Sequence, residues 1–302
     1  MPLPESRARG LATLALLGVT ATWGSTFYLI HDLLDRVPVV DFLAVRFALA
    51  ALALLLLAPR ALGRLSTEGR RHAVVLGSLY GVAQILQTTG LATTPASVGG
   101  FITGMYVVLT PVLAAVLLRT RVDRQTWLAV LLAIGGLGVL TLGGVSHALG
   151  LGYGEALILV STVLYALHIV GLGAWSDAAD AIGMSMIQCA MVAAICAVAA
   201  VPGGISLPHR LGDWVSVGYM AVFAGAAAML GQTWAQAHLP PARSAIIMSM
   251  EPVFAALFAV LLGGESVTVR MLLGGALVLT AMLIVELAPR RHVEGEVTHL
   301  VV

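Results

Sequence analysis

Two charged residues lie deep inside long apolar stretches of this 302-residue chain, and they are the residues best placed to do chemistry. Arg46 lies in the stretch Val39–Leu57, and Glu251 lies in the stretch Ser244–Leu262. A charge inside such a stretch costs about 2.5–3.5 kcal/mol to insert into a bilayer, so we expect an interaction that offsets the cost. Three interpretations stay open: a structural ion pair between the two residues, a substrate site, or a protonation switch at Glu251.

Prolines stand inside two of the apolar stretches, at Pro111 and Pro252. A proline inside a helix removes one backbone hydrogen bond and clashes with the carbonyl four residues back. We therefore predict helix kinks at both prolines, with the carbonyls of Val107 and Met248 short of a partner. Such carbonyls are tolerated in a membrane where they meet protein or line a wet cavity. A plain packing kink and a kink that borders a cavity are the two alternatives.

Amide, hydroxyl and aromatic side chains in the same stretches are candidates for lining a substrate cavity. Buried amides either hold helices together or bind a polar substrate. A histidine can change its charge near neutral pH, but a lone one among apolar residues also fits a packed core. The cavity candidates are Trp23, Ser25, Thr26, Gln84, Gln87, Tyr106, Tyr165, His168, Gln232, Gln236 and Glu251. Because the sequence holds no Walker loop, zinc spacing, nucleophile elbow or paired carboxylate cluster, we expect no enzymatic activity, cofactor or metal.

The elements that carry these residues are predicted to be membrane-spanning helices. Hydrophobic residues make up 59% of the chain and charged residues 10%, and the mean hydropathy is +0.98. A soluble domain carries roughly 25% charged residues, so this chain has too few to cover a surface that faces water. The hydrophobicity does not alternate as it does in a β-barrel. We therefore expect a lipid bilayer and a small-molecule substrate as partners. Because the net charge is only +1, we expect no nucleic acid.

Apolar stretches of about 20 residues, long enough to cross the hydrocarbon core, fill most of the sequence. They predict an all-α integral membrane protein with ten transmembrane helices. The predicted spans are Leu11–Ile30, Val39–Leu57, Val74–Ala92, Val98–Leu118, Trp127–Leu142, Ala156–Leu172, Ile182–Val201, Val215–Ala235, Ser244–Leu262 and Met271–Leu287. The oligomeric state is left open.

The arginines in the connections indicate how the chain crosses the membrane, because cytoplasmic loops carry an excess of basic residues. With a cytoplasmic N-terminus, the outer connections hold only Arg36, Arg210 and Arg270. The inner connections then hold Arg7, Arg9, Arg60, Arg64, Arg70, Arg71, Arg119, Arg121, Arg124, Arg243, Arg290 and Arg291. We therefore predict a multi-pass protein of the cell's inner membrane, with both termini in the cytoplasm.

The two halves of the chain repeat each other. The segment QTTGLATTP (87–95) aligns with QTWAQAHLP (232–240), and TPVLAA (110–115) aligns with EPVFAA (251–256). Trp23-Gly24 corresponds to Tyr165-Ala166. This predicts five helices in residues 1–145, five in residues 150–289, and a cytoplasmic tail in residues 290–302. An odd number of spans inverts the second half relative to the first, and inverted repeats place a substrate site near the midplane between them.

The chain resembles the drug/metabolite transporter superfamily, and within it the EamA-type branch. The resemblance covers almost the whole chain. It rests on the duplicated halves, on WGSTF (23–27), on Arg46 and on EPVFAALFAVLLGGE (251–265). It implies ten helices, cytoplasmic termini, an inverted repeat and a central cavity, in a family whose members often export amino acids, other metabolites or toxic compounds. The sequence departs from the pattern in the first half, where LRTRVDR (118–124) offers no counterpart of Glu265.

The function that these observations favour is secondary transport of a small metabolite, amino acid or drug-like compound. We expect export by alternating access, with a proton as a candidate coupling ion. A membrane enzyme that acts on a lipid-linked substrate would need clustered acidic or histidine residues at an interface, and the loops supply none. A sensor would usually carry a folded domain outside the membrane, and the sequence shows none. A channel or a lipid scramblase stays a further alternative.

Overall fold

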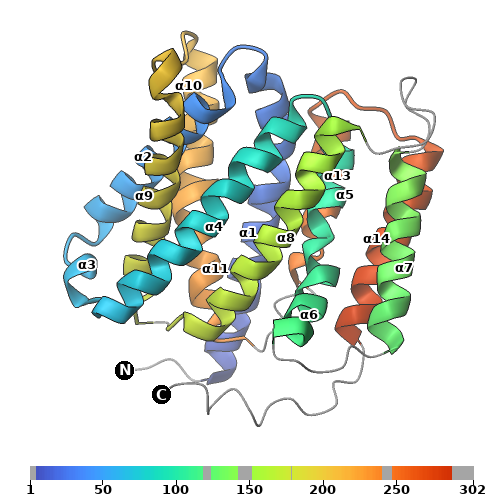
Figure 1. Cartoon of the computed structure of the whole chain (residues 1–302), viewed down its shortest axis with the longest axis horizontal. Coiled ribbons are helices and arrows are strands. Elements are labelled where there is room, and N and C mark those ends of the chain that lie inside the picture. The colour runs from blue at the N-terminus through green and yellow to red at the C-terminus, as the bar shows by residue number, and fades with distance from the viewer. Residues whose placement is uncertain (1–4, 118–123, 142–151, 178, 240–246, 288–302) are drawn as a thin grey trace.

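A computed structural model describes residues 5–117, 124–141, 152–177, 179–239 and 247–287 of the chain, and every regular element in these ranges is helical (Figure 1). The first half contains α1 (Glu5–Leu34), α2 (Val39–Leu57), α3 (Ala61–Arg64), α4 (Thr67–Leu91), α5 (Ala96–Gly104), α6 (Tyr106–Leu117) and α7 (Arg124–Thr141). The second half contains α8 (Tyr153–Trp175), α9 (Ala181–Ala200), η1 (Val201–Gly203), α10 (Leu211–Tyr219), η2 (Met220–Ala227), α11 (Ala228–Gln236), α13 (Glu251–Leu261) and α14 (Val269–Leu287).

Many of these helices, alone or joined end to end, are long and apolar enough to cross a membrane. Within the described ranges, 7 stretches meet that requirement, with α5 and α6 forming one stretch and α10, η2 and α11 another. The helices α7, α13 and α14 are apolar but shorter. The prediction of an all-α membrane protein is therefore confirmed, and each predicted span overlaps at least one of these helices.

The predicted boundaries agree with the structure to different degrees. The span Val39–Leu57 coincides with α2, whereas α4 begins at Thr67, seven residues before the predicted Val74. Ser66 caps that helix by accepting a hydrogen bond from the Gly69 amide at 3.0 Å, which explains why its polar first turns are helical. The predicted boundary between the halves at 145–150, the start of the ninth span at 244–246 and the tail 290–302 lie outside the described residues.

Three predicted spans, the fourth, the eighth and the ninth, are not continuous α-helices. The fourth is interrupted at Met105, which caps α5 with its amide on the carbonyls of Ile102 and Thr103, and α6 starts at the next residue. Pro111 lies five residues further on, inside α6. The eighth passes through the π-helical turn η2, and such turns are frequent at functional sites. The kink predicted at Pro252 is instead a helix start, because α13 begins at Glu251 and Pro252 occupies its first turn.

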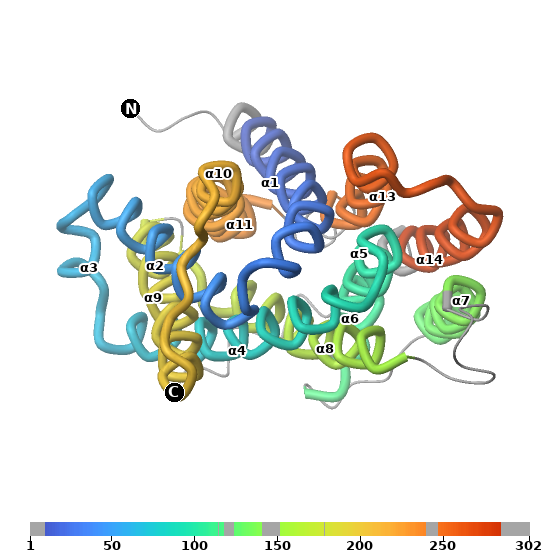
Figure 2. Tube along the Cα trace, turned by 90° about the horizontal axis from the view of Figure 1, so that it is seen from above, coloured from blue at the N-terminus to red at the C-terminus, as the bar shows by residue number. Residues whose placement is uncertain are grey.

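Helices from the two halves pack against each other throughout the bundle. In Figure 2, the pair α2/α9 and the pair α7/α14 lie at opposite edges, and α1, α4, α5, α8, α11 and α13 lie between them. Glycine lets some of these backbones approach closely. A Cβ atom placed on Gly77 of α4 would lie 2.9 Å from Cα of Gln188 on α9, and one on Gly104 would lie 2.9 Å from Cγ of Pro252 on α13.

The arginines separate between the two ends of the bundle. We call the end at which α1 begins the lower end, as drawn in Figure 1, and the opposite end the upper end. The connection from α2 to α4 and the start of α7 bring Arg60, Arg64, Arg70, Arg71 and Arg124 to the lower end. At the upper end, Arg36 forms ion pairs with Asp32 at 2.6 Å and Asp213 at 2.8 Å. Hydrogen bonds from Arg36 to these two carboxylates hold its pKa above the ordinary value.

Candidate functional site

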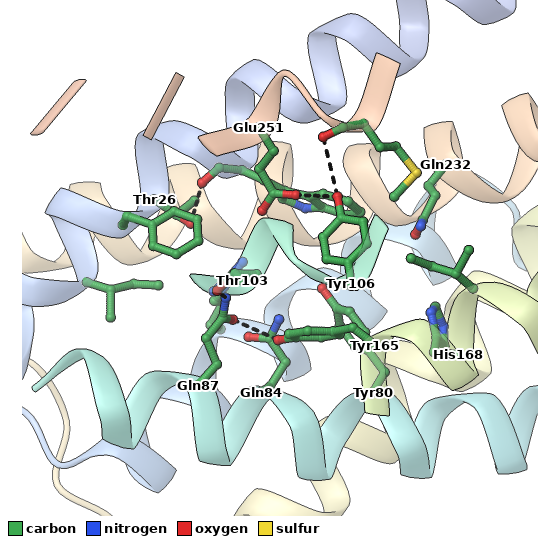
Figure 3. Close-up of a pocket in the computed structure, with 16 residues that line it drawn as sticks. Thr26, Tyr80, Gln84, Gln87, Thr103, Tyr106, Tyr165, His168, Gln232 and Glu251 are labelled. Atoms are coloured by element: carbon green, nitrogen blue, oxygen red, sulfur yellow. Dashed lines mark hydrogen bonds between the residues drawn. The ribbon is translucent and has the colours of Figure 1, made fainter. Parts of the chain in front are cut away.

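A cavity lies in the middle of the bundle, between the two halves, and leaves about 50 Å³ of space for the centres of water molecules (Figure 3). Its wall combines aromatic rings, amides, hydroxyls and both intramembrane charges. The lining residues are Trp23, Thr26, Phe27, Ile30, Arg46, Tyr80, Gln84, Gln87, Thr103, Tyr106, Tyr165, His168, Ile169, Gln232, Met248 and Glu251.

Most of the residues proposed from the sequence lie on this wall. The lining includes Trp23, Thr26, Gln84, Gln87, Tyr106, Tyr165, His168, Gln232 and Glu251. Ser25 and Gln236 are not part of it. The Ser25 hydroxyl hydrogen-bonds the hydroxyl of Tyr219 at 2.8 Å, and the Gln236 amide lies 3.6 Å from the sulfur of Met248. Ser25 therefore contacts α10 away from the cavity, whereas Gln236 contacts Met248, a residue of the cavity wall.

Glu251 lies at the start of α13, where the interrupted ninth span meets the interrupted fourth. The hydroxyl of Tyr106, the first residue of α6, donates a hydrogen bond to Oε2 of Glu251 at 2.7 Å. The same hydroxyl lies 3.5 Å from the Met248 carbonyl, which is the carbonyl that Pro252 leaves without its helical partner. A carboxylate in the first turn also interacts favourably with the positive end of the helix dipole. These contacts offset part of the cost of burying Glu251, which is 4% exposed.

Arg46 reaches the cavity from α2 and is 2% exposed. Its guanidinium carbon lies 5.0 Å from the centre of the Phe47 ring and 5.8 Å from that of Phe42, distances at which an aromatic face attracts a cation. Among the described residues, Arg46 forms no salt bridge, and its Nε atom is buried without a hydrogen-bond partner. Arg46 and Glu251 thus share the cavity, but they are not paired in this structure.

Gln87 connects three helices at the cavity wall. Its amide nitrogen donates to the Thr103 hydroxyl of α5 at 2.9 Å, and its amide oxygen accepts from the Tyr165 hydroxyl of α8 at 2.7 Å (Figure 3). In contrast, the Oε1 atom of Gln232 is buried and has no partner among the described residues. The two glutamines are equivalent in the sequence repeat, so the repeat does not extend to their hydrogen bonding in this structure.

Aromatic side chains of α4 and α8 form the opposite wall. The ring of Tyr80 lies 5.6 Å from that of Tyr165 and 5.1 Å from that of His168, measured between centroids. His168 makes a 2.7 Å hydrogen bond through Nε2 to Oε1 of Gln188, which lies on α9. His168 therefore faces the cavity with its ring while one nitrogen is bound to a neighbouring helix.

The π-helical turn in the eighth span is bound by a cavity residue. Trp23 donates from Nε1 to the carbonyl of Ala224, in the middle of η2, at 3.0 Å. A π-turn changes the backbone hydrogen-bond pattern and can leave carbonyls available for such a side chain. The indole is thereby fixed between α1 and η2, with its ring on the cavity wall.

Several lining residues were not predicted from the sequence. Tyr80 precedes Gln84 by four positions and Gln87 by seven, so the three share one face of α4. This spacing was a signal that could have identified Tyr80. Thr103 lies one turn before Tyr106, but the interruption of the helix between them was not predicted. The apolar lining residues Phe27, Ile30 and Ile169 and the thioether of Met248 gave no signal that distinguishes them from core residues.

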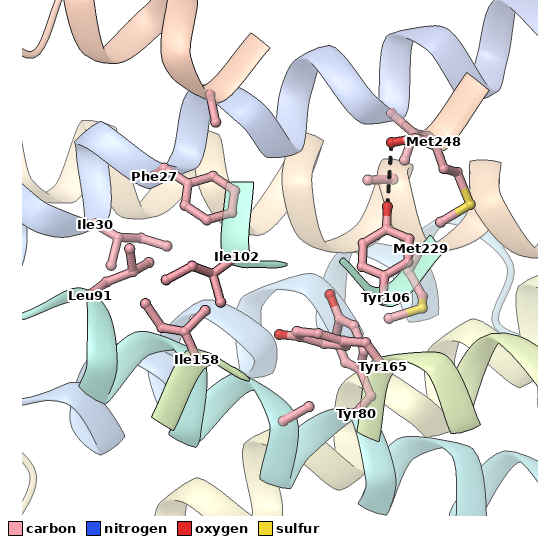
Figure 4. Packing of buried hydrophobic residues seen from close by; sticks show 14 of the residues in the cluster. Phe27, Ile30, Tyr80, Leu91, Ile102, Tyr106, Ile158, Tyr165, Met229 and Met248 are labelled. Carbon is pink, nitrogen blue, oxygen red and sulfur yellow. Dashed lines mark hydrogen bonds between the residues drawn. The ribbon is translucent and has the colours of Figure 1, made fainter. Parts of the chain in front are cut away.

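An apolar cluster separates the cavity from the upper end of the bundle. Figure 4 shows Phe27, Ile30, Leu91, Ile102 and Ile158 packed together on one side of the tyrosines. All five are buried, and they come from α1, α4, α5 and α8. Above them, Glu265 accepts hydrogen bonds from the hydroxyl and the amide of Ser97, in the first turn of α5.

Comparisons with known proteins agree with this architecture. A model of the family described as "EamA-like transporter family" matches residues 10–142 and again residues 152–287. A protein of Archaeoglobus fulgidus described as an uncharacterized transporter is 30% identical over 283 residues, which is 94% of this chain and 88% of that protein. A solved crystal structure superposes with a TM-score of 0.67 at 18% identity, over 90% of this chain and 95% of the other, and shows the fold alone.

Proposed function

Because this chain belongs to the EamA-like transporter family, as the sequence resemblance predicted, we propose that it is a secondary carrier that exports a small organic molecule by alternating access. The observation that carries the proposal is the cavity, which lies inside the bundle, is lined from both halves and holds two charges. Substrate sites near the midplane between repeats are typical of secondary transporters. In this proposal the chain is a carrier and not an enzyme, and it needs no cofactor.

The proposal includes two inverted five-helix repeats, residues 1–145 and 150–289. The packing of the helices supports it. In the proposed repeat, α8 is the counterpart of α1, α11 is that of α4, and α13 is that of α5 and α6. The contact of α1 with α13 then corresponds to the contact of α8 with α5 and α6. The contact of α1 with α11 corresponds to the contact of α8 with α4. The pairs α2/α9, α5/α13 and α7/α14 each join a helix to its own counterpart. This correspondence is what a twofold axis between two repeats would produce, and the family model also matches the chain twice.

The membrane orientation is part of the proposal: an inner-membrane protein with the lower end of the bundle in the cytoplasm. The arginines at the lower end support it through the preference of basic residues for cytoplasmic loops. Single cysteines introduced beside Arg64 and beside Asp35 test it in intact cells, after Cys189 and Cys196 have been replaced. The first should be shielded from an impermeant thiol reagent and the second should react. The reverse pattern would refute the orientation.

Transport itself is tested with the purified chain in proteoliposomes against a panel of radiolabelled metabolites. A saturable flux that competes with unlabelled substrate is the expected result. A protein that folds correctly in the bilayer and moves none of the compounds, or moves them without saturation, would contradict a carrier and favour a channel or a sensor. Flux measured in both orientations of the protein decides whether export is the preferred direction.

Proton coupling is a further part of the proposal and concerns Glu251. Its carboxylate is buried at a helix start and bound to one hydroxyl, so its protonation would change the hydrogen bond that joins α13 to α6. Glu251→Gln keeps the shape and removes the titration. Transport by this variant should lose its dependence on pH between about 5.5 and about 8, whereas Glu68→Gln, at an exposed position of α4, should behave like the native chain. Unchanged pH-dependent transport by Glu251→Gln would exclude coupling at this residue.

A further inference from the structure

The guanidinium of Arg46 is a buried cation on the cavity wall without an acceptor among the described residues. A guanidinium carries five N–H donors and no acceptor. The rings of Phe47 and Phe42, with centres 5.0 Å and 5.8 Å away, attract the positive charge but do not provide oxygen acceptors for those donors. No hydrogen bond or salt bridge joins Arg46 to any residue in the described ranges, and its Nε atom is enclosed without a partner. Buried groups of this kind are ordinarily satisfied, so the missing partner has to come from elsewhere.

The acidic group that shares the cavity does not supply that partner. Glu251 lies at the start of α13, and its Oε2 atom accepts a hydrogen bond from Tyr106 at 2.7 Å. It is not within the 4.0 Å that would make a salt bridge with Arg46. The groups packed around Arg46 are instead the rings of Phe42 and Phe47, the latter in edge contact with Tyr80 at 5.9 Å. The cavity therefore presents its positive charge in an aromatic environment, apart from its negative one.

We propose that Arg46 is the anion-binding residue of the cavity, and that the transported molecule is a small organic monocarboxylate. The inference rests on the proposed function, because it takes the cavity as the place where the transported molecule binds. A guanidinium binds a carboxylate through two parallel N–H···O hydrogen bonds, which would satisfy donors that the described residues leave open. Two features of the cavity favour a single negative charge: Arg46 is the one arginine in the described lining, and Glu251 lines the same cavity.

The wall next to Arg46 also indicates the body of the carboxylate. Tyr80 and Tyr165 lie with their ring centroids 5.6 Å apart, and Tyr80 touches both Phe47 and His168. Ring faces of this kind pack against apolar or planar groups. A carboxylate with an apolar or aromatic body would therefore place its charge on Arg46 and its body against the tyrosines.

Matched probes that differ only in their charged group test the inference. The probes are 3-phenylpropionate, 3-phenylpropanamide, 3-phenylpropylamine and 2-phenylethylphosphonate, and their binding to the purified full-length chain is measured by calorimetry. The native protein should bind the carboxylate about 10- to 100-fold more tightly than the amide, the range that hydrogen bonds to a charged group produce. The amine should bind more weakly than the carboxylate, and so should the phosphonate at an alkaline pH at which it is a dianion. Equal binding of carboxylate and amide, no binding of the carboxylate, or tighter binding of the amine or the phosphonate would overturn the proposal.

Variants connect the preference to Arg46. Arg46→Gln should abolish the preference for the carboxylate and leave the binding of the amide unchanged, and Arg46→Lys should retain part of it. The matched control is Arg71→Gln, at an exposed position of α4, which should behave like the native chain. A carboxylate preference that survives in Arg46→Gln would refute the assignment.

Thermal unfolding separates anion binding by Arg46 from a purely structural role. Because Arg46 has no acceptor among the described residues, empty Arg46→Gln should melt at the same temperature as the native chain or higher. A markedly lower melting temperature would assign Arg46 a structural role instead.

Flux in proteoliposomes tests the proposal of an anion site and the proposal of a carrier separately. Arg46-dependent carboxylate binding without any flux would refute the carrier and leave the anion site. Saturable flux of neutral or cationic solutes only would refute the anion site and leave the carrier.

Discussion

The hydrogen bond between Tyr106 and Glu251 allows a direct measurement of what stabilises the buried carboxylate. Tyr106→Phe removes the hydroxyl and keeps the ring, so the 2.7 Å bond to Oε2 and the 3.5 Å contact with the Met248 carbonyl are both lost. Hydrogen bonds to charged groups contribute about 1.5–3 kcal/mol in proteins, whereas hydrogen bonds between transmembrane helices average about 0.6 kcal/mol. Because this bond is short and Glu251 is only 4% exposed, we expect Tyr106→Phe to lower the free energy of unfolding by about 1–2 kcal/mol.

A double-mutant cycle isolates this bond from the other effects of each substitution. The second substitution is Glu251→Met, which removes the acceptor and approximately keeps the length of the side chain. Free energies of unfolding are measured by equilibrium titration in mixed detergent micelles. Tyr106→Phe should destabilise the native chain by about 1–2 kcal/mol and have almost no effect in the Glu251→Met background, which gives a coupling energy of the same size.

Tyr219 provides the control for this cycle. Its hydroxyl bonds to Ser25 at 2.8 Å, away from Glu251, so Tyr219→Phe and Glu251→Met should be additive to within about 0.5 kcal/mol. A coupling energy for Tyr106 and Glu251 that is no larger than that of the control would refute the reasoning, because the carboxylate would then be stabilised without this hydroxyl.

Two further predictions concern helix packing and the upper end of the bundle. A Cβ atom on Gly24 would lie 2.5 Å from Cβ of Phe254 and 2.8 Å from the amide nitrogen of Ala255, whereas one on Gly18 of the same helix meets no atom within 4 Å. Gly24→Ala should therefore destabilise the protein by about 1–3 kcal/mol in thermal unfolding, and Gly18→Ala should be neutral or stabilise it by up to about 1 kcal/mol; equal effects would contradict the close contact of α1 with α13. Asp213→Asn, which weakens an ion pair whose acidic side chain is 7% exposed, should cost about 1–3 kcal/mol, and Asp32→Asn, at 71% exposure, less than about 1 kcal/mol. The pKa of Arg36 is raised in the folded protein, so the stability that its charge contributes is fully present at any pH below the pKa of an arginine in the unfolded chain. The destabilisation by Asp213→Asn and by Asp32→Asn should therefore not decrease as the pH rises from about 6 to about 9.

The sequence predicted best those helices whose boundaries are set by apolar composition. The span Val39–Leu57 coincides with α2 because Pro38 and Pro59 flank a stretch that is apolar except for Asp41 and Arg46. The start of α4 was predicted seven residues too late, because the stretch before Val74 is polar and only its cap at Ser66 marks it as helical. Hydropathy thus located the part of a helix that faces lipid and missed the part that extends beyond it.

The interruptions inside spans were less accessible to sequence analysis. Pro252 and Pro111 pointed to irregular backbone in the correct spans, but the break in the fourth span falls at Met105, before its proline. The π-turn at Met220–Ala227 has no proline, and its apolar sequence resembles that of an ordinary transmembrane helix. Both features depend on contacts made after folding, such as the bond from Trp23 to the Ala224 carbonyl, which local sequence does not contain.

The interactions of the two intramembrane charges, Arg46 and Glu251, also could not be predicted from the sequence. The cost of burying a charge predicted a compensating interaction for each, and the simplest candidate was an ion pair between them. The structure provides a separate solution for each charge: a helix start and a hydroxyl for Glu251, and two aromatic rings for Arg46. The two solutions differ in one respect, because a hydroxyl satisfies an acceptor on the carboxylate, whereas the rings accept none of the guanidinium's hydrogen bonds in the conventional sense. Arg46 is therefore the charge whose hydrogen-bonding capacity the described part of the protein leaves open toward the cavity.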